Sequence, residues 1–149
     1  MKQIFFFVAL LFAVLTALPL QAQFGTTSRL LFTTDLTGQY EVPAVVTNGR
    51  GIATVFLSED RTMMSIHAVF TGLSSPITAC HFHVGKIGVA GPALIGLSGS
   101  IDGNRLRADI PVTTEFLTKA LKDEIYLNVH TTAHPDGEIR GQLGLMFDN

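Results

Sequence analysis

The sequence contains one cysteine, Cys80, among its 149 residues. A chain with a single thiol cannot close an internal disulfide, so the fold has to be held together by its core. Around this position apolar and polar residues alternate, and Cys80 falls on the apolar side together with Phe82 and Val84. The pattern predicts that Cys80 is buried as a small hydrophobic residue.

The sequence also lacks any run of basic residues. Ten Lys and Arg residues face twelve Asp and Glu residues, which gives a formal net charge of −2 at pH 7. A mildly acidic surface without a basic patch argues against nucleic acid as a partner. Hydrolytic enzymes are also disfavoured, because there is no Gly-x-Ser-x-Gly elbow and no carboxylate pair in surroundings that would separate the two pKa values. We therefore expect a protein without catalytic residues.

Charge is absent from residues 4–20, a long apolar stretch that follows Lys2. Such a stretch, followed by a small residue at Ala22, is typical of a signal peptide and predicts cleavage after Ala22. An uncleaved anchor is the alternative, since the stretch approaches the ~20 residues that span a membrane. We expect a secreted or periplasmic protein that has no membrane contact after cleavage.

Residues 23–149 then form a single domain, because this length suits one core and leaves no room for a second. Short segments rich in Val, Ile, Thr, Phe and Leu recur between Gly, Pro, Asn and Asp. This spacing predicts an all-β protein, an antiparallel Greek-key β-sandwich of about eight strands. The predicted strands are Leu30–Leu36, Gly51–Leu57, Met63–Phe70, Ile77–Val84, Leu94–Ile101, Arg105–Ile110, Ile125–Thr131 and Glu138–Met146.

Two hairpin turns and one helix connect these strands in our prediction. The turns are expected at Ser58–Thr62 and at Asp102-Gly103, where glycine accepts the positive φ of a tight turn. The short crossover helix is expected at Thr114–Leu121, with Thr113 or Thr114 as its N-cap.

Alternation along the strands predicts which side chains leave the core. In Ile77–Val84 it turns His81 and His83 together to the outer face. His67 is expected to be an ordinary surface residue on its own strand. The later strands contribute a second outward set, which consists of Tyr126, Asn128, His130, Glu138, Arg140 and Gln142.

The outward histidines form a candidate metal site. His81 and His83 are two residues apart on one strand face, so their Cα atoms lie ~7 Å apart and both rings can reach one ion. His130 can supply a third ligand from a neighbouring strand, and His134 either a fourth ligand or a position left to water. Neutral imidazoles suit Cu(II) or Zn(II). The alternative is a set of ordinary polar residues on a solvated face.

Several stretches of the chain are similar in order and spacing to the CHRD domain, the module named after its repeats in chordin, in its bacterial secreted form. The resemblance covers roughly residues 33–145 and rests on LTGQYEVP at 36–43, HFH at 81–83, YLNVHT at 126–131 and GEIRGQL at 137–143. Ala44 stands where the family usually repeats proline, and Cys80 and Val84 replace the residues that usually flank the histidine pair. The resemblance implies an extracellular β-sandwich but no established reaction, so function has to be argued from the site.

A second resemblance concerns the histidines alone. His-Phe-His on one strand, Val129-His130 on a later one and Arg140 near the end resemble the copper half of copper-zinc superoxide dismutases. The cysteine pair and the zinc-bearing loop of those enzymes have no counterpart here. If copper binds, storage, delivery or scavenging requires less of the sequence than dismutation does.

The competing hypothesis is a metal-free module that recognises an extracellular protein or glycan. Tyr126, Asn128, Arg140 and Glu41 are the residues that would form its surface. Glu41 and Arg140 also have a structural interpretation, as a carboxylate-guanidinium pair that fixes residues 41–43 to the last strand.

Overall fold

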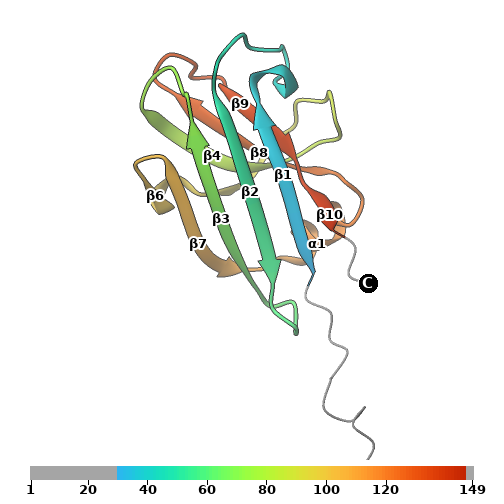
Figure 1. The fold of residues 1–149 in the computed structure, drawn as a ribbon. Coiled ribbons are helices and arrows are strands. Elements are labelled where there is room, and N and C mark those ends of the chain that lie inside the picture. The colour runs from blue at the N-terminus through green and yellow to red at the C-terminus, as the bar shows by residue number, and fades with distance from the viewer. Residues whose placement is uncertain (1–29, 147–149) are drawn as a thin grey trace, which may run out of the picture.

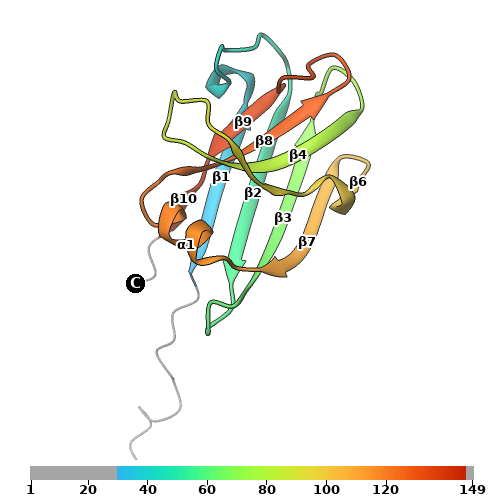
Figure 2. The ribbon, with the colours of Figure 1, turned by 180° about the vertical axis from the view of Figure 1, so that it is seen from behind.

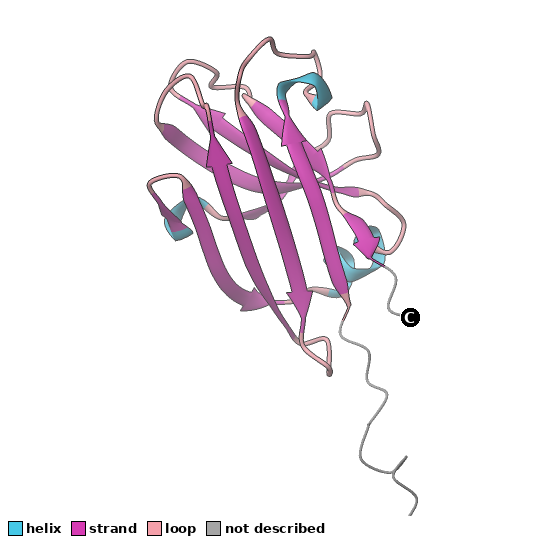
Figure 3. Ribbon diagram, in the orientation of Figure 1, coloured by secondary structure: helices cyan, strands magenta, loops and turns pink. Residues whose placement is uncertain are grey.

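A computed structural model of the chain describes residues 30–146. These residues form ten β-strands, one α-helix and two 3-10 helices (Figure 3). The strands are β1 (Leu31–Thr37), β2 (Arg50–Leu57), β3 (Met63–Thr71), β4 (Ile77–Val84), β5 (Ala93–Gly96), β6 (Ile101–Asp102), β7 (Arg105–Pro111), β8 (Ile125–Thr131), β9 (Ile139–Gln142) and β10 (Gly144–Met146). The helices are α1 (Thr114–Ala120), η2 (Gly38–Tyr40) and η3 (Ser98–Ser100).

The predicted signal peptide, residues 1–22, lies outside the described residues. Between residues 30 and 146 no helix is long and apolar enough to cross a membrane.

All ten strands belong to one antiparallel sheet with the order β5-β4-β8-β9-β1-β2-β3-β7-β6, and β10 pairs with β1. The sheet curls over a single core. Figure 1 shows β1, β2, β3 and β7 in front with β4, β8 and β9 crossing behind them, and Figure 2 shows the reverse view. The β1 strand makes the curl possible, because it pairs with β2 along one edge and with β9 and β10 along the other.

The all-β prediction is confirmed, but the expected sandwich of about eight strands is replaced by this curled sheet of ten. The predicted strand Leu94–Ile101 is interrupted by η3, where Leu97 turns into the core. The predicted strand Glu138–Met146 is divided at Leu143, whose N–H bonds to Ile125 while the following residues leave β8 and join β1. Because of each division, one predicted strand pairs with two different strands of the curled sheet.

The core lies inside the curl and follows the predicted alternation. In β3, Met64, Ile66, Ala68 and Phe70 are buried, and His67 between them is exposed. The helix α1 closes one end of the core by placing Phe116 against Phe82. Its predicted N-cap is confirmed, because the Thr113 hydroxyl accepts a hydrogen bond from the N–H of Phe116 at 3.0 Å.

The outer face of β8 and β9 is buried as well, which the alternation did not predict. Tyr126 is 4% exposed, Asn128 3%, Arg140 3% and Glu138 0%. The reason is tertiary: residues 86–91 of the β4–β5 connection make hydrogen bonds to Tyr126 and Arg140 and cover them, and Glu41 after η2 does the same for Asn128. Glu138 is instead enclosed by hydrogen bonds from Thr47, Ser74 and Thr131. A polar layer therefore lies between this part of the sheet and the loops.

Candidate metal centre

Three histidines meet on the outer face of two neighbouring strands. His81 and His83 come from β4 and His130 from β8, and the two strands pair in antiparallel register with His81 opposite Asn128 and Ala79 opposite His130. On the opposite side of the same strands, Cys80, Phe82 and Val129 are buried in the core. The predicted placement of all three histidines on one outer face is thus confirmed.

The rings are close enough to share one ion. One nitrogen of each of the three histidines lies within 4.8 Å of the other two, and among residues 30–146 no other group of three or more His, Cys, Asp or Glu residues meets this condition. Nδ1 of His81 lies 3.2 Å from Nε2 of His130. Three nitrogens bound to one ion at 2.0–2.1 Å would be about 3.3–3.6 Å apart, so this pair already has nearly the required spacing.

Two backbone carbonyls orient the rings and determine their tautomers. Nδ1 of His83 lies 2.9 Å from the carbonyl oxygen of Gly91, and Nδ1 of His130 lies 2.8 Å from that of Pro135. Because a carbonyl oxygen only accepts, each Nδ1 carries the proton and each Nε2 keeps its lone pair. Metal-binding histidines in general donate their other N–H in this way.

Nε2 of His83 is buried and has no hydrogen-bond partner among residues 30–146. A buried polar atom without a partner costs about 1–3 kcal/mol, so such atoms call for an explanation. A bound ion at the point where the three rings converge would satisfy it.

The surroundings keep two of the histidines neutral. Burial lowers the pKa of His81 below 6.5, and the neighbouring His130 and His83 lower it further. Burial also lowers the pKa of His83, an effect that His130 and Arg140 reinforce and that the Gly91 carbonyl opposes. Neutral imidazoles are the form that coordinates metals.

His83 is also held by the aromatic ring of Tyr126. The two rings stack with centroids 4.9 Å apart and an interplanar angle of 14°. The Tyr126 hydroxyl accepts from the N–H of Gly91 at 3.1 Å and lies 3.3 Å from its carbonyl oxygen. The guanidinium carbon of Arg140 lies 3.4 Å from the Tyr126 ring centroid. Because β8 lies between β4 and β9, His83 and Arg140 approach this ring from opposite sides.

His134, the fourth predicted ligand, does not belong to the cluster. It lies in the turn after β8, where its backbone N–H donates to the carbonyl of Thr131. Its own carbonyl accepts from the N–H groups of Thr131 and Gly137. The turn contributes to the site through the carbonyl of Pro135 instead. Neither this carbonyl nor that of Gly91 was predicted, since every residue type has one.

Glu41 and Arg140 do not form the expected ion pair. The Glu41 carboxyl accepts a hydrogen bond of 2.6 Å from Asn128, and the guanidinium of Arg140 donates to the carbonyls of Lys86 and Val89. The segment after η2 is therefore attached to β8, and the β4–β5 connection to β9.

Fold and site together define an all-β antiparallel protein with a histidine cluster on the covered face of its sheet. The family model of the CHRD domain matches residues 32–143, which is most of the chain. The chain belongs to the CHRD-domain family, as its sequence resemblance predicted, and this is consistent with an extracellular binding module. No curated protein and no solved structure matches the chain significantly, so the likeness to copper-zinc superoxide dismutases gains no support.

Proposed function

We propose that this chain is an exported, non-enzymatic CHRD-domain protein that binds a transition-metal ion, copper or zinc, through His81, His83 and His130. The observation that carries the proposal is the buried, unpartnered Nε2 of His83, on a ring that has one nitrogen within 4.8 Å of a nitrogen of each of the other two histidines. The ring is buried, its Nδ1 carries the proton, and it lies beside the two other imidazoles. Each of these features favours an Nε2 lone pair directed at a cation.

The donor set narrows the choice of metal. Three neutral imidazoles suit Cu(II) and Zn(II), whereas Mg²⁺ and Ca²⁺ prefer oxygen ligands. Because His134 lies outside the cluster, the fourth coordination position is open to water or to a group from another molecule. An exported protein with such a site is suited to storing, delivering or scavenging the ion.

Replacing the ligands tests this proposal directly. The His81→Gln/His83→Gln double variant should bind Zn(II) and Cu(II) about 100-fold more weakly or worse, since two of three ligands are lost while their hydrogen-bonding capacity is kept. Affinity is measured by competition with a chromophoric chelator. His67→Gln is the matched control, because His67 is exposed on β3 and should leave the affinity unchanged.

Removal of the ion gives an independent measurement. A chelator should lower the Tm of the metal-loaded wild type and leave the Tm of the double variant unchanged, because a ligand that binds only the folded state stabilises it. Equal affinities in wild type and double variant would assign the metal to other groups and overturn the proposal.

The metal-free interaction module remains the competing hypothesis. It predicts a Tm that does not respond to chelators and a partner whose binding depends on Tyr126 or Arg140. The burial of Tyr126 and Asn128 weakens it, because a protein or glycan could not contact these side chains without displacing the covering loops.

A further inference from the structure

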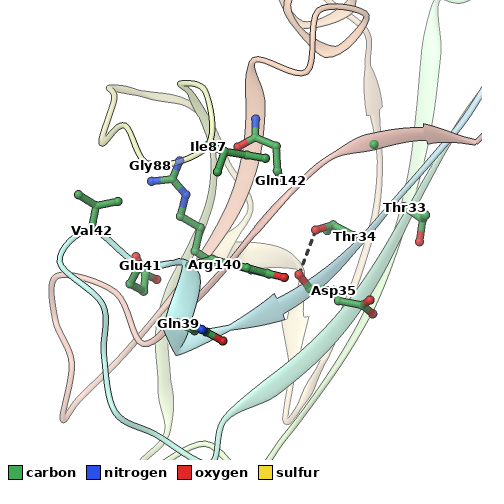
Figure 4. A pocket seen from close by; sticks show the side chains of 12 residues that line it. Thr33, Thr34, Asp35, Gln39, Glu41, Val42, Ile87, Gly88, Arg140 and Gln142 are labelled. Atoms are coloured by element: carbon green, nitrogen blue, oxygen red, sulfur yellow. Dashed lines mark hydrogen bonds between the residues drawn. The ribbon is translucent and has the colours of Figure 1, made fainter.

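A hollow opens on the outer face of the sheet, beyond the histidine cluster. It lies over β1 and β9, between the segment Gln39–Val42 and the β4–β5 connection at Ile87 and Gly88, with a volume of about 470 Å³ (Figure 4). This size is within the range of small-molecule sites. The structure thus has a concave site that is separate from the three histidines.

Arg140 is the buried cation of this hollow. It is 3% exposed, its Nη2 donates to the carbonyls of Lys86 and Val89 at 3.1 and 3.0 Å, and its guanidinium lies over Tyr126. The donors on Nη1 and Nε have no acceptor among the described residues, and no carboxylate between residues 30 and 146 forms an ion pair with this side chain. A fixed guanidinium with free donors is a binding site for a planar oxyanion.

The carboxyl group nearest to this cation is that of Glu41. Burial raises the pKa of Glu41 to about 7, although Arg140 and the hydrogen bond from Asn128 act in the opposite direction. Near neutral pH a large fraction of Glu41 is therefore uncharged and does not cancel the charge of Arg140. The other charged groups here are Asp35, which is exposed on β1, and Lys86, whose ammonium lies 3.7 Å from Glu124.

Apolar side chains border the hollow. Tyr40 is 52% exposed, Val42 42% and Ile87 78%, and all three belong to its lining. Figure 4 shows the guanidinium of Arg140 in view between Val42 and Ile87. A ligand that fits has one charged end and a short apolar body.

We propose that this hollow binds a small carboxylic acid, with the carboxylate on Arg140 and the apolar body against Val42 and Ile87. The proposal is independent of the metal site and applies to the metal-free protein. Protonation of Glu41 assists binding because it removes a negative charge beside the incoming carboxylate. Asp35 opposes binding weakly, since it is exposed and screened by solvent.

Butyrate is the probe, titrated into the full chain in the presence of a chelator and followed by NMR at the backbone amides of Gln39 and Gly88. We expect saturable binding with a dissociation constant of about 1 mM or tighter, which a ligand of this size can reach. Binding should be up to about tenfold tighter near pH 6 than near pH 8, because Glu41 titrates between them. Butyramide, which lacks the charge, should not bind.

Three variants test the location. Glu41→Gln should bind butyrate near pH 8 as tightly as the wild type does near pH 6. Gly144→Leu should abolish binding by filling the hollow, since a Cβ at Gly144 meets no atom closer than 3.8 Å and the fold can accept it. Gly99→Leu is the matched control, because a Cβ there meets nothing within 4 Å and Gly99 is not part of the lining.

Retained butyrate binding in Gly144→Leu would overturn the proposal, as would equal binding of butyramide and butyrate by the wild type. A pH dependence that persists in Glu41→Gln would also contradict it. His81→Gln/His83→Gln should bind butyrate normally, so failure of the metal proposal and failure of this one are distinguishable.

Discussion

Glu138 shows how strongly tertiary contacts can change the environment of one residue. It is fully buried, and its carboxylate accepts four hydrogen bonds: from the Thr47 hydroxyl, the Ser74 N–H, the Ser74 hydroxyl and the Thr131 hydroxyl. Burial raises the pKa of Glu138, but these hydrogen bonds together outweigh burial and hold the pKa below 4.5. One carboxylate thus connects three segments that are far apart in the sequence.

Glu138→Gln should lower the free energy of unfolding near pH 7 by about 2–4 kcal/mol, because an amide nitrogen then faces donors that need an acceptor. A carboxylate whose folded pKa is depressed stabilises above its unfolded value, near 4.5, and the effect is lost as pH falls through the folded pKa. The difference between wild type and variant should therefore shrink below about pH 4. Urea unfolding near pH 7 and below about pH 4 measures this difference in the free energy of unfolding. A difference that does not depend on pH would contradict the assignment of a charged carboxylate to Glu138.

The β4–β5 connection is the element on which the metal site depends most. It gives the Gly91 carbonyl to His83 and lies over Tyr126. It also accepts the hydrogen bonds of Arg140. A Cβ at Gly91 would lie 1.7 Å from the carbonyl oxygen of Val84, so no other residue fits without moving the backbone. The sequence did not predict this role of Gly91, since a contact between backbone segments leaves no local pattern.

Gly91→Ala should weaken Zn(II) binding by about 10–100-fold even though no ligand changes, because the orientation and tautomer of His83 are no longer fixed. Chelator competition gives the affinity, and Gly99→Ala is the control, since a Cβ at Gly99 meets no atom within 4 Å. Unchanged affinity in Gly91→Ala would show that the carbonyl of this loop does not support the site.

At the scale of the whole molecule, the curled sheet places side chains of the same strand in two environments, the core inside the curl and the face outside it. Cys80 is fully buried in the core between His81 and Ala79, and burial raises the pKa of its thiol to about 12. The thiol and the imidazoles are adjacent in sequence but face opposite sides of β4.

Cys80 should therefore stay unmodified by a thiol-specific reagent in the native protein near pH 8, because the reactive thiolate is both scarce and inaccessible. In denaturant one thiol per chain should react rapidly. The rate under native conditions should follow global unfolding, and rapid reaction of the folded protein would contradict the core placement of β4.

The sequence by itself determined which side chains of each strand point into the core and which point away from it. Alternation with a period of two is a local property, and it correctly placed His81, His83 and His130 outside and Cys80 and Phe82 inside. Only the tertiary structure decided what covers the outer face. The burial of Tyr126 and Arg140 and the carbonyls at the imidazoles arise from contacts between distant segments, and a backbone carbonyl is the same in every residue. The curl depends likewise on one strand, β1, pairing along both of its edges, which no pattern within that strand reveals.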